Sequence, residues 1–98
     1  MATGDEYSEE DARTIGYSIG IDWKNVDLEQ FRLGLQVEME HGSHDPETNV
    51  IGDDVHLAGK ITWAHLKEIP DYYSRLLKME AEAEAEAEME SESNYTNE

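Results

Sequence analysis

Apolar residues recur at helical spacing through the middle of the chain. At about 100° per residue, one stripe is formed by four apolar side chains, Leu28, Phe31, Leu35 and Met39. Leu33 and Val37 fall on the opposite side, so this helix is expected to pack against more than one neighbour. Gly34 has no side chain and would let one neighbour come close. We expect the central helix to begin after Asp27 and to end at Gly42 in a left-handed cap.

Capping signals place one helix before this central helix. Ser8 to Asp11 resembles a capping box, and Gly20 is expected to end the first helix. Between them, three apolar residues recur at helical spacing, Ala12, Ile15 and Ile19. Asp27 and Gln30 have the spacing of a second capping box, which starts the central helix.

Two further helices are predicted after the turn-rich residues 42–54. Asp53 or Asp54 caps a third helix, which carries four apolar residues, Leu57, Ile61, Ala64 and Leu66. Pro70 lacks a backbone donor, so a break near Ile69 is expected. A fourth helix then begins at Asp71. Three of its residues are expected to point inward, Tyr73, Leu76 and Leu77.

Residues 79–90 are a low-complexity run of alanine and glutamate. Intrinsic propensity favours a helix there, but pairs such as Glu80 and Glu84 place like charges four residues apart. At 1 M salt the Debye length is about 3 Å, which screens that repulsion, so the helix is expected to persist in high salt and to fray in low salt. The predicted fold is an all-α small bundle of about four helices with an acidic Ala/Glu helical C-terminal extension. We divide the chain into a flexible N-terminus (1–7), a helical domain (8–79) and an acidic tail (80–98).

The charge balance narrows the function classes. The chain has 98 residues, with 24 Asp and Glu against 7 Lys and Arg, for a formal net charge of −17. Such a surface repels phosphates, so direct nucleic-acid binding and binding to anionic membranes are not expected. No apolar run reaches the roughly 20 residues that span a membrane. Three interpretations remain: a halophilic protein, a nucleic-acid mimic, or an ordinary domain with acidic tails.

Several motifs together resemble a known family. They include Gly20-Ile-Asp-Trp23, Glu38-Met-Glu-His-Gly42, Asp45-Pro-Glu-Thr-Asn-Val50 and His65-Leu-Lys-Glu-Ile-Pro-Asp-Tyr-Tyr73. In order and register they resemble a family of small proteins of unknown function that recurs in tailed-phage and prokaryotic genomes. The resemblance covers about residues 12–79 and implies a shared fold without an established activity. With the acidic composition, it suggests a tailed virus of a haloarchaeon.

Two pairs of polar residues are the candidate site. Glu38 and His41 are three residues apart on the central helix, and His65 and Glu68 are three apart on the third. Helical bundles use the Glu-x-x-His spacing for metal ligands, so these four residues are the candidate ligands of a transition metal. The alternative is structural: His65 hydrogen-bonds a tyrosine, and the carboxylates are solvated.

One contact is predicted under either interpretation. Glu38 lies about 60° from the centre of the apolar stripe, so its carboxylate should be partly buried and needs a donor. His65, Glu68 and Tyr72 share a face of the next helices. We therefore expect Glu38 or His41 to contact this face, in a polar network without metal.

The first functional hypothesis is a non-enzymatic structural or interaction protein associated with virions. Its expected partners are other virion or viral structural proteins, with a homo-oligomer left open, and its location is the virion or the host cytoplasm. No cofactor is expected for this role. The alternatives are a metal-dependent enzyme that uses the His/Glu cluster, and an acidic nucleic-acid mimic that acts on a host protein.

Overall fold

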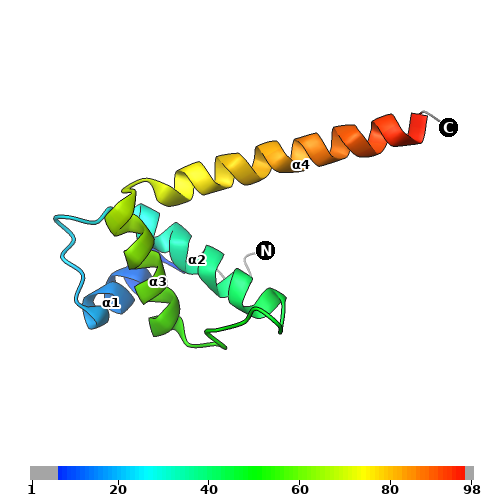
Figure 1. Ribbon diagram of the computed structural model, residues 1–98. Coiled ribbons are helices and arrows are strands. Elements are labelled where there is room, and N and C mark those ends of the chain that lie inside the picture. The colour runs from blue at the N-terminus through cyan, green and yellow to red at the C-terminus, as the bar shows by residue number, and fades with distance from the viewer. Residues whose placement is uncertain (1–6, 97–98) are drawn as a thin grey trace.

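The computed structural model describes residues 7–96, and this part of the chain is all-α. Its helices are α1 (Glu9–Ile19), α2 (Leu28–His44), α3 (Val55–Glu68) and α4 (Tyr72–Thr96). The first three helices pack together, whereas α4 leaves them and extends away (Figure 1). The predicted fold class is confirmed. We call residues 8–76 the head and residues 77–90 the projection.

Local capping chemistry sets the ends of α1 as the sequence predicts. The Ser8 hydroxyl accepts a hydrogen bond from the Asp11 N–H at 3.0 Å, and the Asp11 carboxylate accepts one from the Ser8 N–H at 3.3 Å. This is a complete capping box. Gly20 ends the helix with φ of 99°, a left-handed conformation that glycine adopts without strain.

The core of the head forms around α2. Phe31 and Leu35, both from the predicted stripe, are fully buried, together with Ala12 of α1 and Tyr73 of α4. At Gly34, α3 and α4 approach α2 closely, because a Cβ there would collide with Thr62 and with the Tyr73 ring. The close approach expected at Gly34 is therefore confirmed.

The prediction that Gly42 ends the central helix in a left-handed cap was wrong. α2 continues to His44 and ends at Asp45, which has an extended backbone. Gly42 is buried inside the helix, where a Cβ would meet the Ile51 side chain. Gly42 therefore makes room for the loop that folds back over α2.

α3 is capped by Asp54, whose carboxylate accepts from the backbone N–H groups of His56 and Leu57. The residues of α3 that are buried are mainly small: Ala58, Gly59, Thr62 and Leu66. Leu57, by contrast, is 42% exposed, so small side chains rather than the largest apolar ones set the packed face. This face allows α3 to lie close to α2.

The predicted break before α4 is present. Ile69 has an extended backbone, as the residue before a proline prefers, and its N–H donates to the His65 carbonyl at 2.9 Å. α4 begins at Tyr72, directly after this turn. Tyr73 is buried and Leu76 half-buried, but Leu77 is 41% exposed, contrary to its predicted inward position.

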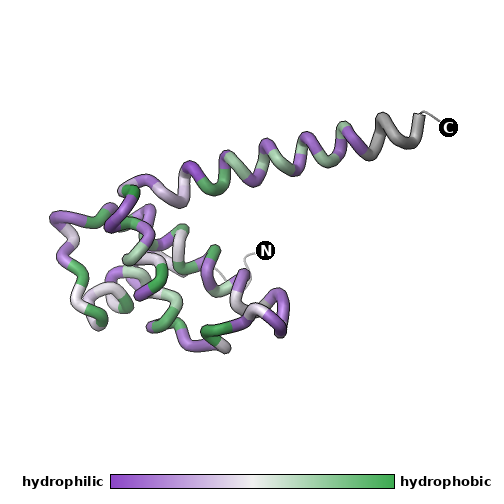
Figure 2. The backbone as a smooth tube through the Cα atoms, viewed as in Figure 1, coloured by the Kyte–Doolittle hydropathy of each residue, from purple (hydrophilic) through white to green (hydrophobic). Residues whose placement is uncertain are grey.

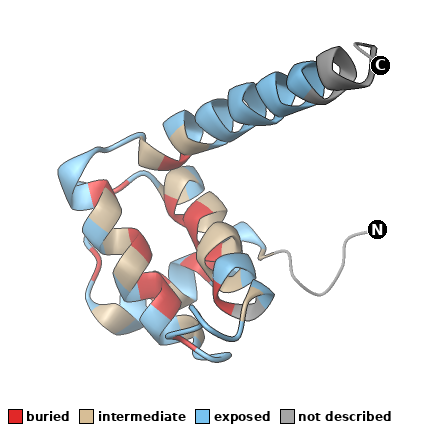
Figure 3. Ribbon diagram, turned by 45° about the vertical axis from the view of Figure 1, so that its right-hand side comes forward, coloured by how far each residue is buried: buried red, intermediate tan, exposed pale blue. Residues whose placement is uncertain are grey.

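The projection differs from the head in burial. Every residue from 77 to 90 is exposed, while buried residues are concentrated in the head (Figure 3). Hydrophilic and hydrophobic residues alternate along the projection (Figure 2), so around a helix they form no continuous apolar face. Among the described residues, no helix has the length and apolar character needed to cross a membrane.

Candidate functional site

A polar cluster joins three helices at the base of α4. Glu38 comes from α2, one turn after Gly34 and Leu35, so it lies at the edge of the buried stripe. His65 comes from α3, one turn after the buried Thr62. Tyr73 is the second residue of α4 and is fully buried. Because these three side chains contact one another from three different helices, we call Glu38, His65 and Tyr73 the clamp.

The clamp is held by short contacts. The Tyr73 hydroxyl donates to Glu38 Oε2 at 2.8 Å, and His65 Nδ1 lies 2.8 Å from the same hydroxyl. His65 Nδ1 is also 3.4 Å from Glu38 Oε2. The predicted contact between Glu38 and the His65 face is therefore present.

The hydrogen bonds determine where the protons lie. A phenol hydroxyl has one proton, and the Tyr73 hydroxyl uses it to donate a hydrogen bond to Glu38. His65 therefore approaches Tyr73 as a donor, with a proton on Nδ1. The Tyr72 ring stacks on His65 with centroids 4.3 Å apart and an interplanar angle of 17°, which fixes the orientation of the imidazole.

Burial and the neighbouring carboxylate keep Tyr73 protonated. Burial is the larger cause that raises the pKa of Tyr73 above its ordinary value of 10.0, and the hydrogen bond to Glu38 raises the pKa further. The side chain of Glu38 is itself only 13% exposed. A fully buried phenol that stays protonated is a hydrogen-bond donor that stabilises the fold.

A second contact, which the sequence analysis missed, caps the start of α4. The Gln30 side-chain oxygen accepts from the Tyr73 N–H at 3.1 Å and from the Ser74 N–H at 3.3 Å, and its amide donates to the Ser74 hydroxyl at 2.6 Å. These are first-turn N–H groups, which have no partner inside their own helix. Gln30 thus caps a helix more than 40 residues away. Half of the predicted capping box is present, because the Gln30 N–H donates to Asp27 Oδ1 at 3.0 Å, whereas the Gln30 side chain contacts α4 instead of the Asp27 backbone.

The remaining predicted site residues lie outside the clamp. The His41 side chain is 60% exposed, and its Nε2 lies 3.9 Å from Glu80 Oε2 of α4. Glu68 is exposed near the C-terminal end of α3. The structure therefore brings together Glu38, His65 and Tyr72 of the predicted set, but not His41 or Glu68. Within residues 7–96, no three His, Asp or Glu side chains are grouped so that they would hold a metal ion.

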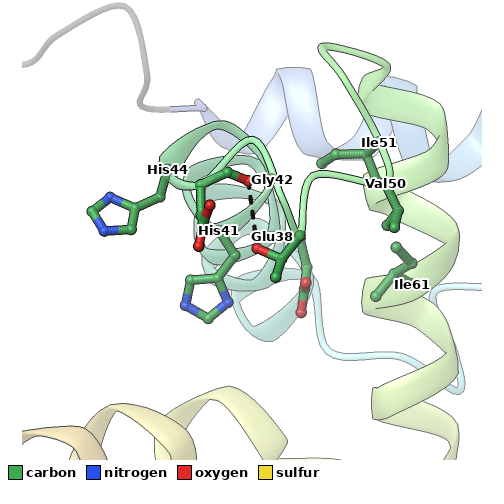
Figure 4. Close-up of a pocket in the computed structure, with 9 residues that line it drawn as sticks. Glu38, His41, Gly42, His44, Val50, Ile51 and Ile61 are labelled. Atoms are coloured by element: carbon green, nitrogen blue, oxygen red, sulfur yellow. Dashed lines mark hydrogen bonds between the residues drawn. The ribbon is translucent and has the colours of Figure 1, made fainter.

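An open pocket of about 430 Å³ lies beside the clamp, at the C-terminal end of α2 (Figure 4). Glu38 and His41 line one side of it, and Val50, Ile51 and Ile61 supply apolar surface. Val50 is 78% exposed. The sequence does not predict this pocket, because the pocket forms only when the loop after α2 folds back toward α3.

Comparison with known proteins identifies the family. Residues 12–82 match the family described as Protein of unknown function (DUF5661), and the chain belongs to this family. No curated protein and no solved structure matches the chain.

Proposed function

We propose that this member of the family is a non-enzymatic interaction protein, carried in the particle of a tailed virus of a haloarchaeon. The observation that carries the proposal is the projection: a helix whose first turn is fixed to the head, and whose residues 77–90 are all exposed. A helix without an apolar face gains little from packing on its own domain. It is free to contact another molecule.

The charge of the projection indicates the kind of partner. Residues 79–90 carry six glutamates and no lysine or arginine. Neighbouring glutamates on successive turns repel one another, and either salt or a basic partner surface relieves that repulsion. Molar salt and a basic protein partner both fit the proposed setting, with other virion proteins as the partners.

The division of these glutamates between two sides of the helix favours a protein partner over mimicry of nucleic acid. Glu80 and Glu82 point about 200° apart around the helix, whereas Glu80 and Glu84 share a side. A mimic of a phosphate backbone concentrates its carboxylates along one face, which an even division between two sides does not do. The clamp also gives no support to an enzymatic role, since its phenol is buried and its carboxylate already accepts a hydrogen bond.

The test is the protein content of purified particles. Quantitative mass spectrometry of gradient-purified virions should find the protein at a stoichiometry fixed relative to a known capsid subunit. The infected cytoplasm, with a non-structural viral enzyme as the marker, is the control. Finding the protein only in the cytoplasmic fraction would contradict a virion role.

A further inference from the structure

The pocket beside Glu38 combines a carboxylate with an apolar wall. The side chain of Glu38 is only 13% exposed, and its contacts to Tyr73 and His65 both use Oε2. Glu38 and Asp45 both line the pocket, so an incoming cationic group would meet two carboxylate side chains there. Neither a phenol nor an imidazole is a permanent cation, so the charge of the largely buried Glu38 is only partly compensated.

The opposite wall suits an aliphatic stem. Val50, Ile51 and Ile61 lie together on one side of the pocket (Figure 4). Arginine and lysine side chains carry an apolar stem with a charge at the end, and they bury the stem on apolar surface while the charge finds a carboxylate. A volume of about 430 Å³ holds one such side chain with water.

We propose that this pocket binds a basic side chain, arginine or lysine, of a partner protein. The cationic head meets Glu38, and the stem lies on Val50 and Ile61. The net charge of −17 makes a basic partner surface the complementary one. The pocket is also continuous with the acidic projection, because His41 on its rim lies 3.9 Å from Glu80. One basic partner would then reach the pocket and the projection together.

This inference rests on the proposed interaction role for the identity of the occupant. The test of the pocket does not use virus particles, so the pocket inference and the proposed function can be contradicted independently. If the protein were absent from virions, binding of the basic probe in the pocket would still be a valid result. If the probe did not bind, the protein could still be a component of the particle.

The experiment is an NMR titration of the ¹⁵N-labelled full chain with Nα-acetyl-arginine methylamide. The control ligand is the citrulline analogue, which has nearly the same shape without the charge. We expect saturable shifts of the backbone amides of Gly42, Thr48 and Ile51, with the citrulline analogue binding roughly tenfold more weakly, as loss of one charge-assisted hydrogen bond implies.

Two matched variants locate the contact. Glu38→Gln keeps an acceptor for Tyr73 and removes the charge, so the arginine probe should bind roughly tenfold more weakly. Glu47→Gln removes one charge from the same loop region at an exposed position outside the pocket lining, and should leave affinity within about twofold. Val50→Ser, at a position 78% exposed, tests the apolar wall without disturbing the fold and should weaken binding.

Three results would overturn the proposal. They are equal binding of the arginine and citrulline probes, equal effects of Glu38→Gln and Glu47→Gln, and shifts confined to residues 80–90. If Glu38→Gln does not fold, unchanged binding in Val50→Ser would overturn it as well.

Discussion

The head and the projection belong to one chain but are stabilised by different interactions. In the head, Phe31, Leu35 and Tyr73 are fully buried, and side-chain capping bonds hold the N-terminal ends of α1, α2 and α3. In the projection, nothing is buried, and the helix depends on the propensity of alanine and glutamate against the repulsion of its own charges. Burial depends little on salt, whereas charge repulsion depends on it strongly. The clamp lies at the boundary between the two regions, where α4 leaves the packed head and becomes exposed.

Tyr73→Phe should be the most damaging conservative change in the head. It removes the hydroxyl that joins Glu38 to His65 and leaves a largely buried carboxylate without its phenolic donor. We expect the free energy of unfolding at pH 7 to fall by about 1.5–3 kcal/mol, measured by urea denaturation. Tyr17→Phe, at a position 80% exposed, should change it by less than about 0.5 kcal/mol.

The same variant should reveal a pH dependence above pH 10. The pKa of Tyr73 is raised in the folded state, so the unfolded chain loses this proton first, from about its ordinary pKa of 10.0. The stabilisation is complete below that pH and is lost as pH rises above it, by at most about 1.4 kcal/mol per pH unit. The stability gap between the native chain and Tyr73→Phe should therefore narrow above pH 10. A constant gap from pH 9 to pH 11 would contradict this account.

Gly34→Ala tests how closely the helices of the head approach. The added Cβ would lie 2.5 Å from Tyr73 Cε2 and would also collide with Thr62. Overpacking of this kind should cost about 2 kcal/mol in thermal or urea unfolding. Gly59→Ala is the matched control, because its Cβ meets nothing closer than 3.3 Å and alanine favours helix. Equal stability of the two variants would contradict the close approach of α3 and α4 to α2 at Gly34.

Gln30→Ala should have a smaller effect than Tyr73→Phe or Gly34→Ala. It removes the oxygen that caps the Tyr73 and Ser74 N–H groups, and loss of a cap costs about 1 kcal/mol. Ser74→Ala keeps both backbone bonds to Gln30 and loses only the hydroxyl contact, so it should cost less. Urea denaturation of the two variants measures which of them loses more free energy of unfolding.

Local features of the head were predictable from sequence because they depend on neighbouring residues. Ser8, Gly20 and Pro70 end or start helices through bonds within a few positions, and all three act as predicted. The partial burial of Glu38 followed from its angle to the apolar stripe. Its contact with His65 followed from the need for a donor.

Tertiary features were not predictable in the same way. Gln30 has the spacing of a capping box, and only the fold shows that it caps a distant helix. Gly42 could serve as a left-handed cap or as a site of close packing, and the sequence does not separate these roles. Tyr73 was expected to point inward, but its role as the centre of the clamp depends on three helices meeting.

Residue-resolved hydrogen exchange at low salt and at 1 M salt tests the division between head and projection most directly. Backbone amides of α2 and α3 should exchange slowly in both conditions, because they lie in the packed head. Amides of residues 80–90 should exchange fast at low salt and more slowly at 1 M, as screening restores the helix. Equal and salt-independent protection of residues 80–90 and of α2 would show that the projection is packed, and would contradict the account.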